Sequence, residues 1–299
     1  MDGLVIKSTG SRYWVEVADG EVIEARIKGR FRLQGIRTTN PLAVGDKVTV
    51  EGEQIVAIKE RANYIIRKAS NLSKESHILA ANIDQVLLFV TLSQPQTPNE
   101  FVDRFLVTAM AYAVPVVMVV NKIDLLEDFA YLQAYCYLYR SLGYQVIATS
   151  LQTGEGVEEL KQMMKGKVSL LAGNSGVGKS SFINAVDASL QVKTGDVSKA
   201  HQTGMHTTTN AEMYQVAGGR IIDIPGIKGF GIIDMEAHEI GHYFPEIFRF
   251  SKDCRFSDCL HQNEPDCAVR KALLSHQISE SRYQSYLSIL DDISSGKYR

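Results

Sequence analysis

The stretch "KVSLLAGNSGVGKSSFINAV", residues 167–186, predicts the fold of the central part of this chain. An apolar strand over 167–171 runs into the loop "GNSGVGKS", 173–180, and an amphipathic run follows it. Glycines let such a loop turn its backbone N–H groups toward phosphate oxygens, and the N-terminus of the next helix adds a favourable dipole. This spacing, between a strand and a helix, indicates a phosphate-binding loop rather than a chance glycine-rich turn.

Outward from this loop, the segment 84–226 alternates apolar strands with amphipathic helices. Strands that are apolar throughout and are separated by helices are typical of a parallel sheet covered on both faces. Ligands of such open sheets bind beyond the carboxyl ends of the strands, so we expect the functional residues to gather at one edge. The predicted strands are 84–92, 115–120, 145–149, 167–173 and 218–226, and the predicted helices are 100–113, 127–142, 156–164 and 180–186.

The phosphate loop supplies the first set of candidate ligands. Lys179 would bridge the β and γ phosphates of a nucleotide, and the Ser180 hydroxyl would ligate Mg²⁺. We expect the residues around the phosphates to be Gly173, Asn174, Ser175, Gly176, Val177, Gly178, Lys179, Ser180 and Ser181.

A second strand end, "RIIDIPG" at 220–226, is where a further Mg²⁺ contact belongs. Asp223 would make that contact, and the backbone N–H of Gly226 would reach the γ-phosphate. Asp-x-Pro-Gly alone is also ordinary turn chemistry, so this prediction depends on its pairing with the phosphate loop on a neighbouring strand.

The polar stretch "TGMHTTTN", 203–210, lies between these two motifs. A threonine hydroxyl there could complete the Mg²⁺ shell only while the γ-phosphate is present, which makes the segment a candidate switch. We assign this contact to Thr208, and its neighbours Thr207 and Thr209 are the alternatives. The other interpretation is a threonine-rich loop that caps a strand.

The motif "NKID", 121–124, closes an apolar strand and predicts a guanine site. The Asp124 carboxylate can accept hydrogen bonds from guanine N1–H and N2–H₂, and a site that leaves buried polar groups unpaired rejects adenine. Lys122 would lie over the ring, and Asn121 would tie this loop to the phosphate loop. In "TSLQTGEG", at the end of the next strand, Ser150 would shape the turn and the Leu151 N–H would reach guanine O6.

The base-reading motif precedes the phosphate loop in this chain, although all these motifs fall at carboxyl ends of strands. Chain order is free when the termini of a domain lie close together and are joined elsewhere. We therefore predict a circularly permuted nucleotide-binding domain. The Asp-x-Pro-Gly segment then runs directly into the C-terminal domain. A change in this segment that depends on the bound nucleotide can therefore displace that domain.

Residues 1–60 predict a small β-barrel, because five short strands are separated by turn residues. The strands are 4–8, 13–17, 21–27, 46–50 and 54–58, and the most plausible architecture is an OB-fold. The segment 68–82 starts polar and irregular, so we interpret it as a linker.

One face of this barrel is a candidate RNA contact. In "RIKGRFR", the basic residues Arg26, Lys28, Arg30 and Arg32 alternate and would share one strand face. Tyr13 and Trp14 are available for base stacking. The plainer interpretation is a solvated strand face.

The segment "CRFSDCLHQNEPDC", 254–267, predicts a structural zinc site. Three thiolates and one imidazole, from Cys254, Cys259, His261 and Cys267, match a tetrahedral Cys₃His set. A segment with so few apolar residues needs such a metal to fold. Incidental cysteines and a disulfide are the alternatives, and a closing helix is predicted over roughly 268–292.

The base motif, phosphate loop, His-Thr-Thr-Thr segment and Asp-x-Pro-Gly, in this order, resemble the circularly permuted RsgA (YjeQ/YloQ) family of GTPases. The resemblance covers essentially the whole chain, including the barrel and the zinc segment. It implies GTP hydrolysis to GDP and phosphate, stimulated by the small ribosomal subunit and its rRNA during late subunit assembly. It also implies a fold of three domains: an OB-fold barrel, a permuted P-loop GTPase domain and a mostly helical zinc-binding domain. We expect these over 1–67, 68–232 and 233–299.

The residue that orients the attacking water is not given by the usual motif. Many GTPases use a glutamine just after the Asp-x-x-Gly glycine, but Ile227 occupies that position and cannot bind water. His206, inside the candidate switch, is the nearest alternative, and the resemblance points to the same residue. A histidine in a loop can also be merely solvated.

Two other functions are compatible with parts of the sequence. A P-loop kinase or ATP-dependent enzyme is disfavoured because no acceptor-substrate constellation is visible and Asp124 selects guanine. An RNA-binding protein with slow or vestigial turnover is supported by Ile227 alone.

The composition fits a cytoplasmic protein. The formal net charge of −2 excludes a uniformly basic nucleic-acid coat, and we expect no signal peptide because residues 1–10 show no basic start followed by an apolar run. The longest apolar run, 113–120, is too short to span a bilayer. Three of the four cysteines lie in the zinc segment, which suits a reducing compartment, and we expect a monomer.

Overall fold

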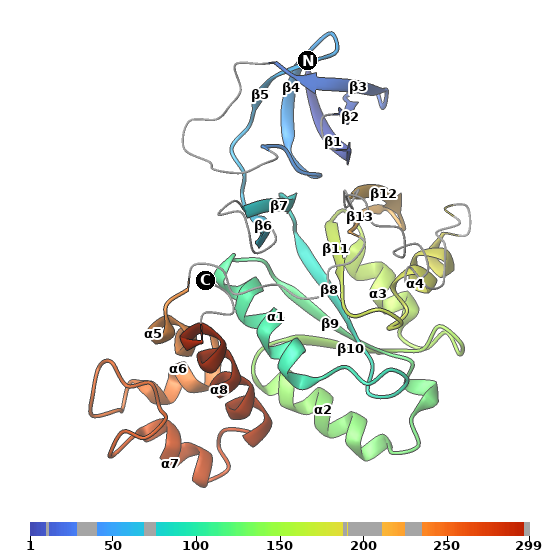
Figure 1. Cartoon of the computed structure of the whole chain (residues 1–299). Helices are drawn as coiled ribbons and strands as arrows, with labels where there is room; N and C mark the ends of the chain where they lie inside the picture. The colour runs from blue at the N-terminus through green and yellow to red at the C-terminus, as the bar shows by residue number, and fades with distance from the viewer. Residues whose placement is uncertain are drawn as a thin grey trace.

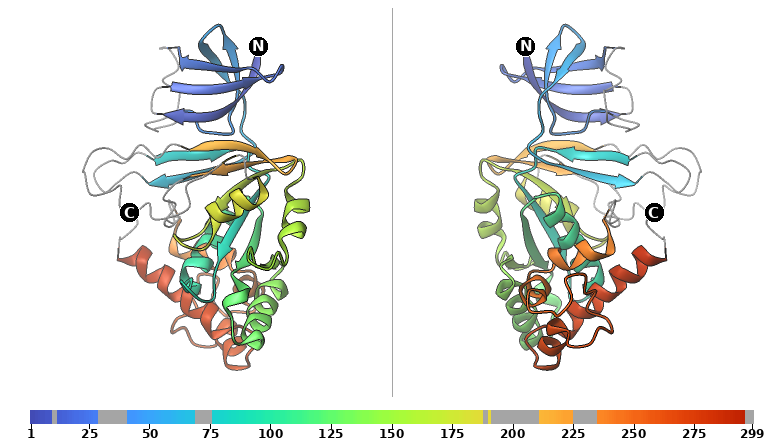
Figure 2. Two further views of the ribbon diagram at one scale, coloured as in Figure 1. Left: turned by 90° about the vertical axis from the view of Figure 1, so that its right-hand side faces the viewer. Right: turned by 90° about the vertical axis from the view of Figure 1, so that its left-hand side faces the viewer.

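A computed structural model describes residues 1–9, 12–28, 41–68, 76–187, 190, 211–224 and 235–295 of the 299-residue chain. The barrel and the C-terminal helices lie at opposite ends of the molecule, with a sheet covered by helices between them (Figures 1 and 2). Within the described residues no helix has the length and apolar character needed to cross a bilayer.

The N-terminal barrel is built from β1–β5. Its strands pair in the order β1-β2-β3-β5-β4 and close through β1 and β4, with β3 and β5 parallel. This closure is that of an OB-fold, as predicted, and it leaves a small core around Val5, Val15 and Val48. The strands are β1 Asp2–Thr9, β2 Arg12–Val17, β3 Val22–Ile27, β4 Lys47–Glu51 and β5 Gln54–Ile58.

The linker interpretation of 68–82 is wrong for its second half. Strand β7 (Ser76–Ala81) pairs antiparallel with β6 (Tyr64–Lys68). The reason lies in the apolar tail of the segment, because Ile78 and Ala80 are buried, as is Ile65 on β6. The hairpin lies between the barrel and the central domain (Figure 1).

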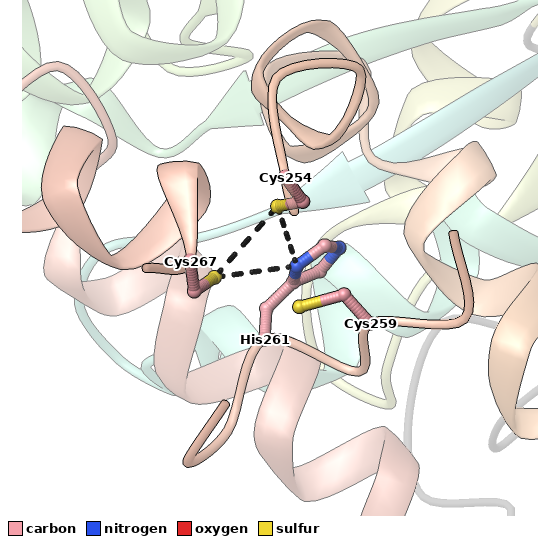
Figure 3. Close-up of side chains that lie close together, drawn as sticks. All are labelled: Cys254, Cys259, His261 and Cys267. Atoms are coloured by element: carbon pink, nitrogen blue, oxygen red, sulfur yellow. Dashed lines mark hydrogen bonds between the residues drawn. The ribbon is translucent and has the colours of Figure 1, made fainter. Parts of the chain in front are cut away.

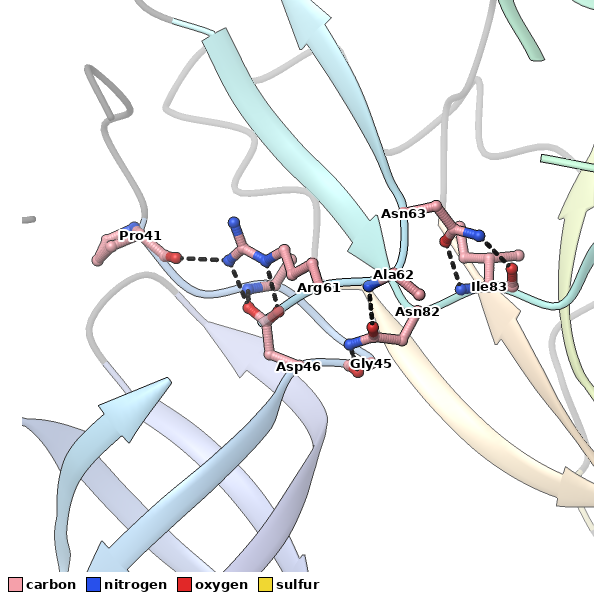
Figure 4. A network of polar contacts seen from close by, with 9 residues as sticks. Pro41, Gly45, Asp46, Arg61, Ala62, Asn63, Asn82 and Ile83 are labelled. Atoms are coloured by element: carbon pink, nitrogen blue, oxygen red, sulfur yellow. Dashed lines mark hydrogen bonds and ion pairs between the residues drawn. The ribbon is translucent and has the colours of Figure 1, made fainter. Parts of the chain in front are cut away.

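A polar joint fixes the barrel to this hairpin (Figure 4). Arg61 donates from Nε and Nη2 to the two oxygens of the fully buried Asp46, each over 2.6 Å. Asn82 donates to the Gly45 carbonyl at 2.8 Å and accepts from the Ala62 N–H at 2.9 Å. Gly45 has φ +94°, and a Cβ there would clash with the backbone of Ala81, so only glycine fits this close approach.

The central sheet joins the barrel through β12 and continues in the order β12-β13-β11-β8-β9-β10. Its strands are parallel except β12, which forms a hairpin with β13 that was not predicted from the sequence. The strands are β8 Gln85–Val90, β9 Val116–Asn121, β10 Gln145–Thr149, β11 Val168–Ala172, β12 Glu212–Val216 and β13 Gly219–Asp223.

Helices cover both faces of this sheet because successive strand side chains point to opposite sides. Val86 and Leu88 of β8 share one core with α1 and α2, whereas Leu87 and Phe89 share the other with α3 and α4. The helices are α1 Asn99–Ala111, α2 Phe129–Ser141, α3 Val157–Met164 and α4 Lys179–Val186, with a 3-10 turn η1 at Ile123–Leu125.

The C-terminal region is helical, but the predicted closing helix over 268–292 is two helices. His276 has φ +58°, a left-handed conformation that ends α7, and Ser279 is the N-cap of α8. The elements are α5 Ala237–Ile240, η3 Gly241–Tyr243, α6 Pro245–Ser251, α7 Ala268–Leu274 and α8 Glu280–Ser294.

A buried ionic cluster joins this region to the central domain. Arg282 on α8 donates to Glu246 on α6 at 2.6 and 3.2 Å and to Asp103 on α1 at 2.6 Å. The Tyr139 hydroxyl on α2 also donates to Asp103, at 2.8 Å. The three charged side chains are at most 4% exposed, so they are stabilised by contacts with one another and with Tyr139 and not by water.

Candidate nucleotide site and metal centre

The predicted nucleotide ligands that the structure describes gather at one edge of the central sheet. Asn121 ends β9 beside Thr149, which ends β10, and Asp223 ends β13 beside Leu171 of β11. The phosphate loop follows directly from β11 and leads into α4. These positions are carboxyl ends of parallel strands, where open α/β sheets bind ligands.

The phosphate loop has a backbone that requires glycine at two positions. Gly173 has φ +132°, and a Cβ there would clash with the Phe89 carbonyl. Gly178 has φ +100°, and a Cβ there would come within 3.0 Å of Asn121 Nδ2. The loop therefore folds tightly against β8 and β9, with its main chain forming the lining.

The Lys179 ammonium lies inside this loop, where its Nζ donates to the carbonyls of Gly173 and Asn174, each at 2.7 Å. Burial lowers the pKa of Lys179, and the charge of Asp223 opposes that shift. Burial likewise raises the pKa of Asp223, opposed by Lys179. A partly desolvated cation and a partly desolvated carboxylate thus act on each other at this edge, and a phosphate and its Mg²⁺ need one group of each charge.

Asn121 links the base-reading strand to the phosphate loop. Its side chain is 2% exposed, and Nδ2 donates to the Val177 carbonyl at 2.8 Å. The Thr149 hydroxyl donates to Asn121 Oδ1 at 3.0 Å, which fixes the orientation of the amide. Thr149 was not among the predicted site residues, although its place at the end of the strand after Asn121 was a usable signal.

The Asp124 carboxylate is exposed and is held from one side. The Ser150 hydroxyl donates to Asp124 Oδ1 at 2.5 Å and accepts from the Thr153 N–H at 3.1 Å. Leu151 follows Ser150 at the same edge. Lys122 adopts a left-handed conformation, φ +62°, and its Nζ donates to the Gln94 carbonyl at 2.8 Å.

Several predicted site residues lie outside the described residues. They are His206, Thr207, Thr208, Thr209, Gly226 and Ile227.

The four predicted zinc ligands converge (Figure 3). Their ligand atoms all lie within 4.8 Å of one another. Cys254 Sγ is 3.9 Å from Cys267 Sγ and 3.6 Å from His261 Nδ1, and Cys267 Sγ is 3.5 Å from the same nitrogen.

These spacings fit zinc. With Zn–S of about 2.3 Å and Zn–N of about 2.0–2.1 Å, a tetrahedron has S···S edges of about 3.8 Å and S···N edges of about 3.6 Å. Burial lowers the pKa of His261, which favours the neutral imidazole that binds metal. The donor set can therefore hold a closed, structural zinc ion.

The loop that carries the ligands is braced by hydrogen bonds. Glu264 accepts from the N–H groups of Leu260, Gln262 and Asn263, over 2.7 to 3.0 Å. The Tyr283 hydroxyl on α8 donates to the His261 carbonyl at 2.6 Å. The chain thus fixes the backbone of the metal loop as well as its ligands.

Two of the four basic residues predicted to line an RNA contact on the barrel are described by the structure. Arg26 and Lys28 are both exposed, at alternate positions at the end of β3, whereas Arg30 and Arg32 lie outside the described residues. The expectation that Tyr13 is available for stacking is wrong, because it is 1% exposed in the barrel core. Trp14 is partly exposed, with Lys7 Nζ 5.5 Å from its ring centroid.

Comparisons with known proteins agree with this architecture. The family model described as RsgA GTPase matches residues 58–233, and that described as RsgA N-terminal domain matches residues 2–56. A small ribosomal subunit biogenesis GTPase RsgA of Bacteroides fragilis is 55% identical, over 100% of this chain and 99% of its own. The corresponding protein of Christiangramia forsetii is 50% identical, over 97% of this chain and 96% of its own.

Solved structures give the same result. The crystal structure of YjeQ from Thermotoga maritima matches with a TM-score of 0.76 and 35% identity, over 97% of each chain. That of YloQ, described as a circularly permuted GTPase, matches with a TM-score of 0.74 and 30% identity, over 100% of this chain and 96% of the other.

Proposed function

This chain belongs to the RsgA GTPase family, and from that premise we propose that it hydrolyses GTP as an assembly factor of the small ribosomal subunit. The observation that carries the proposal is the 55% identity over the full chain to a protein named for small ribosomal subunit biogenesis. The protein acts in the cytoplasm as a monomer, on the subunit and its rRNA.

Guanine is selected by Asp124. Its carboxylate accepts from N1–H and N2–H₂ of the base, with the Ser150 hydroxyl holding Oδ1 in position at 2.5 Å. Adenine has neither donor, so it would leave the carboxylate without its hydrogen bonds. Lys122 covers the ring, and the Leu151 N–H binds guanine O6.

The phosphates lie in the loop from Gly173 to Ser181. Lys179 Nζ donates to two loop carbonyls, and a bound nucleotide would offer β- and γ-phosphate oxygens in their place. Ser180, Asp223 and Thr208 would hold Mg²⁺, which would neutralise negative charge on the phosphates. The Gly226 N–H would reach the γ-phosphate.

Hydrolysis needs a group that orients water. Ile227 cannot do this, so we assign the task to His206, which the small subunit would help to position. This accounts for turnover that depends on the subunit.

The zinc site serves stability, and the barrel serves recognition. One zinc ion, held by Cys254, Cys259, His261 and Cys267, stabilises the C-terminal domain. The exposed Arg26 and Lys28 contact rRNA phosphates, which gives affinity without sequence preference.

The test is turnover of GTP and of ATP, with and without purified small ribosomal subunits. We expect GTP hydrolysis to rise strongly with the subunit and ATP to be inert. Equal use of ATP would contradict the base assignment. Turnover indifferent to the subunit would contradict the ribosomal role, and His206→Ala would then have no stimulated rate to abolish.

A further inference from the structure

The first strand of the barrel is shared between two sheets. Its start, Asp2–Leu4, pairs with β4 and closes the barrel, whereas Lys7 pairs with Glu212 on β12. The pairing of β1 with β2 shifts register between Val5 and Lys7. Such an irregularity bends a strand, and here it accompanies the change of partner from β4 to the edge of the central sheet.

Two ion pairs reinforce this junction, one to each strand of the β12–β13 hairpin. Lys7 Nζ is 3.1 Å from Glu212 Oε1, and Arg220 Nη2 on β13 is 2.5 Å from Glu16 Oε2 on β2. The side chains of Arg220 and Glu16 are only 29% and 23% exposed. Both strands of the hairpin are therefore attached to the barrel.

The end of the hairpin that carries Glu212 also lies at the nucleotide site. Glu212 is paired with Asp223, the last residue of β13, which lies beside Leu171 of β11, and the Asp223 charge acts on Lys179. In the sequence, β12 begins two residues after the candidate switch 203–210. The hairpin thus connects the residues that would sense the γ-phosphate to the barrel.

A second attachment gives the barrel a fixed point. The joint of Arg61 with Asp46 and of Asn82 with Gly45 is partly buried (Figure 4). It lies beside β1, because the Gly45 N–H donates to the Val5 carbonyl and the Val5 N–H donates to the Asp46 carbonyl. The hairpin and this joint therefore hold the barrel at neighbouring positions of β1.

We propose that the β12–β13 hairpin is a mechanical link that passes the nucleotide state to the barrel through Lys7–Glu212 and Glu16–Arg220. Building on the proposed function, the nucleotide then alters the affinity of the barrel for the small subunit. By thermodynamic linkage the subunit alters nucleotide affinity by the same factor, which for coupled sites is typically about 5- to 150-fold.

The link is tested by reversing one ion pair. Glu16→Arg and Arg220→Glu each break it, and the double variant restores it with the charges exchanged. Glu24→Arg is the matched control, because Glu24 also pairs with an arginine, Arg12 at 3.1 Å, but within the barrel. None of these side chains belongs to the nucleotide site.

The first readout needs no ribosome. Hydrogen exchange of barrel peptides covering residues 2–17 is compared with GDP and with a non-hydrolysable GTP analogue. We expect a nucleotide-dependent difference in the wild type, the control and the double variant, and none in either single variant. No difference in the wild type, or a difference that survives in the single variants, would overturn the link.

The second readout is the dissociation constant for purified small subunits in the two nucleotide states. The ratio of the two constants cancels any general effect of the altered charge on RNA affinity. We expect the ratio of the two dissociation constants to be about fivefold or more smaller in each single variant than in the wild type. The double variant should regain the wild-type ratio. If the wild type binds no subunit at all, the proposed function fails, while hydrogen exchange still decides the link.

Discussion

Replacing Arg282 by methionine should undock the C-terminal region from the central domain. The guanidinium makes three hydrogen bonds of 2.6 to 3.2 Å to Glu246 and Asp103, and every side chain of the set is at most 4% exposed. Removing one partner of a buried ionic cluster typically costs about 3–5 kcal/mol, because it leaves uncompensated buried charge. At about 2 °C per kcal/mol for a chain of this size, Tm should fall by roughly 6–10 °C.

The measurement is thermal and urea unfolding of the zinc-loaded protein. Lys271→Met is the control, because Lys271 is 66% exposed and pairs with Asp266 at 3.2 Å at the surface. Exposed pairs contribute about 0–1 kcal/mol, so this variant should unfold almost like the wild type. If Arg282→Met lowered the free energy of unfolding by less than about 1 kcal/mol, the reasoning that these charges are buried together would be refuted.

The destabilisation caused by Arg282→Met should depend on pH. Burial raises the pKa of Asp103 above its ordinary value of 3.8, and Arg282 opposes that rise. A raised folded-state pKa means that the native state holds the proton more tightly, so this contribution to stability is lost as the pH rises through the raised pKa. Without Arg282 the pKa rises further. The destabilisation should therefore be largest at neutral pH and shrink as the pH falls toward about 4, and a loss independent of pH would contradict this.

Three further changes test the nucleotide and zinc sites. Asp124→Asn should weaken GDP binding by about 100-fold, since hydrogen bonds to a charged group contribute about 1.5–3 kcal/mol each; an unchanged Kd in a fluorescent-GDP titration would contradict the base assignment. Gly178→Ala should weaken GDP binding by about tenfold or more, because alanine in a left-handed backbone conformation costs about 1–2 kcal/mol and its Cβ would clash with Asn121. Gly143→Ala, at φ +92° in open space, is its control and should leave GDP affinity intact. Cys259→Ser or a chelator should remove one zinc per chain and reduce the helical circular dichroism, whereas retained helicity without zinc would show that the metal is not structural.

Local patterns were sufficient to predict most of this fold. The phosphate loop, "NKID" and the cysteine spacing are short motifs whose strand and helix contexts are written in the adjacent residues. The OB-fold and the sheet domain followed from the rhythm of apolar runs. Tyr13 was misjudged, although its alternation with Val15 and Val17 already indicated the inward face of a strand.

Features that depend on distant partners could not be predicted. Strand β7 resembles a linker in sequence, and only the burial of Ile78 and Ala80 in the folded protein identifies it as a strand. Strand β12 is short and lies between polar residues. The ionic cluster joins Asp103 to Arg282 across 179 positions. The one local hint was an acidic residue within the apolar face of α1, and nothing nearby identified its partner.

The contact between β1 and β12 also has a consequence for synthesis. Lys7 and Glu212 lie 205 residues apart, so at about 5–20 residues per second the ribosome needs on the order of 10–40 s to supply the second strand. During that time the barrel can close through β1 and β4, while the Lys7 end of β1 presents an unpaired backbone edge. We expect the nascent chain to carry a finished barrel that is not yet anchored at this edge. The junction between the barrel and the nucleotide domain is then among the last contacts to form.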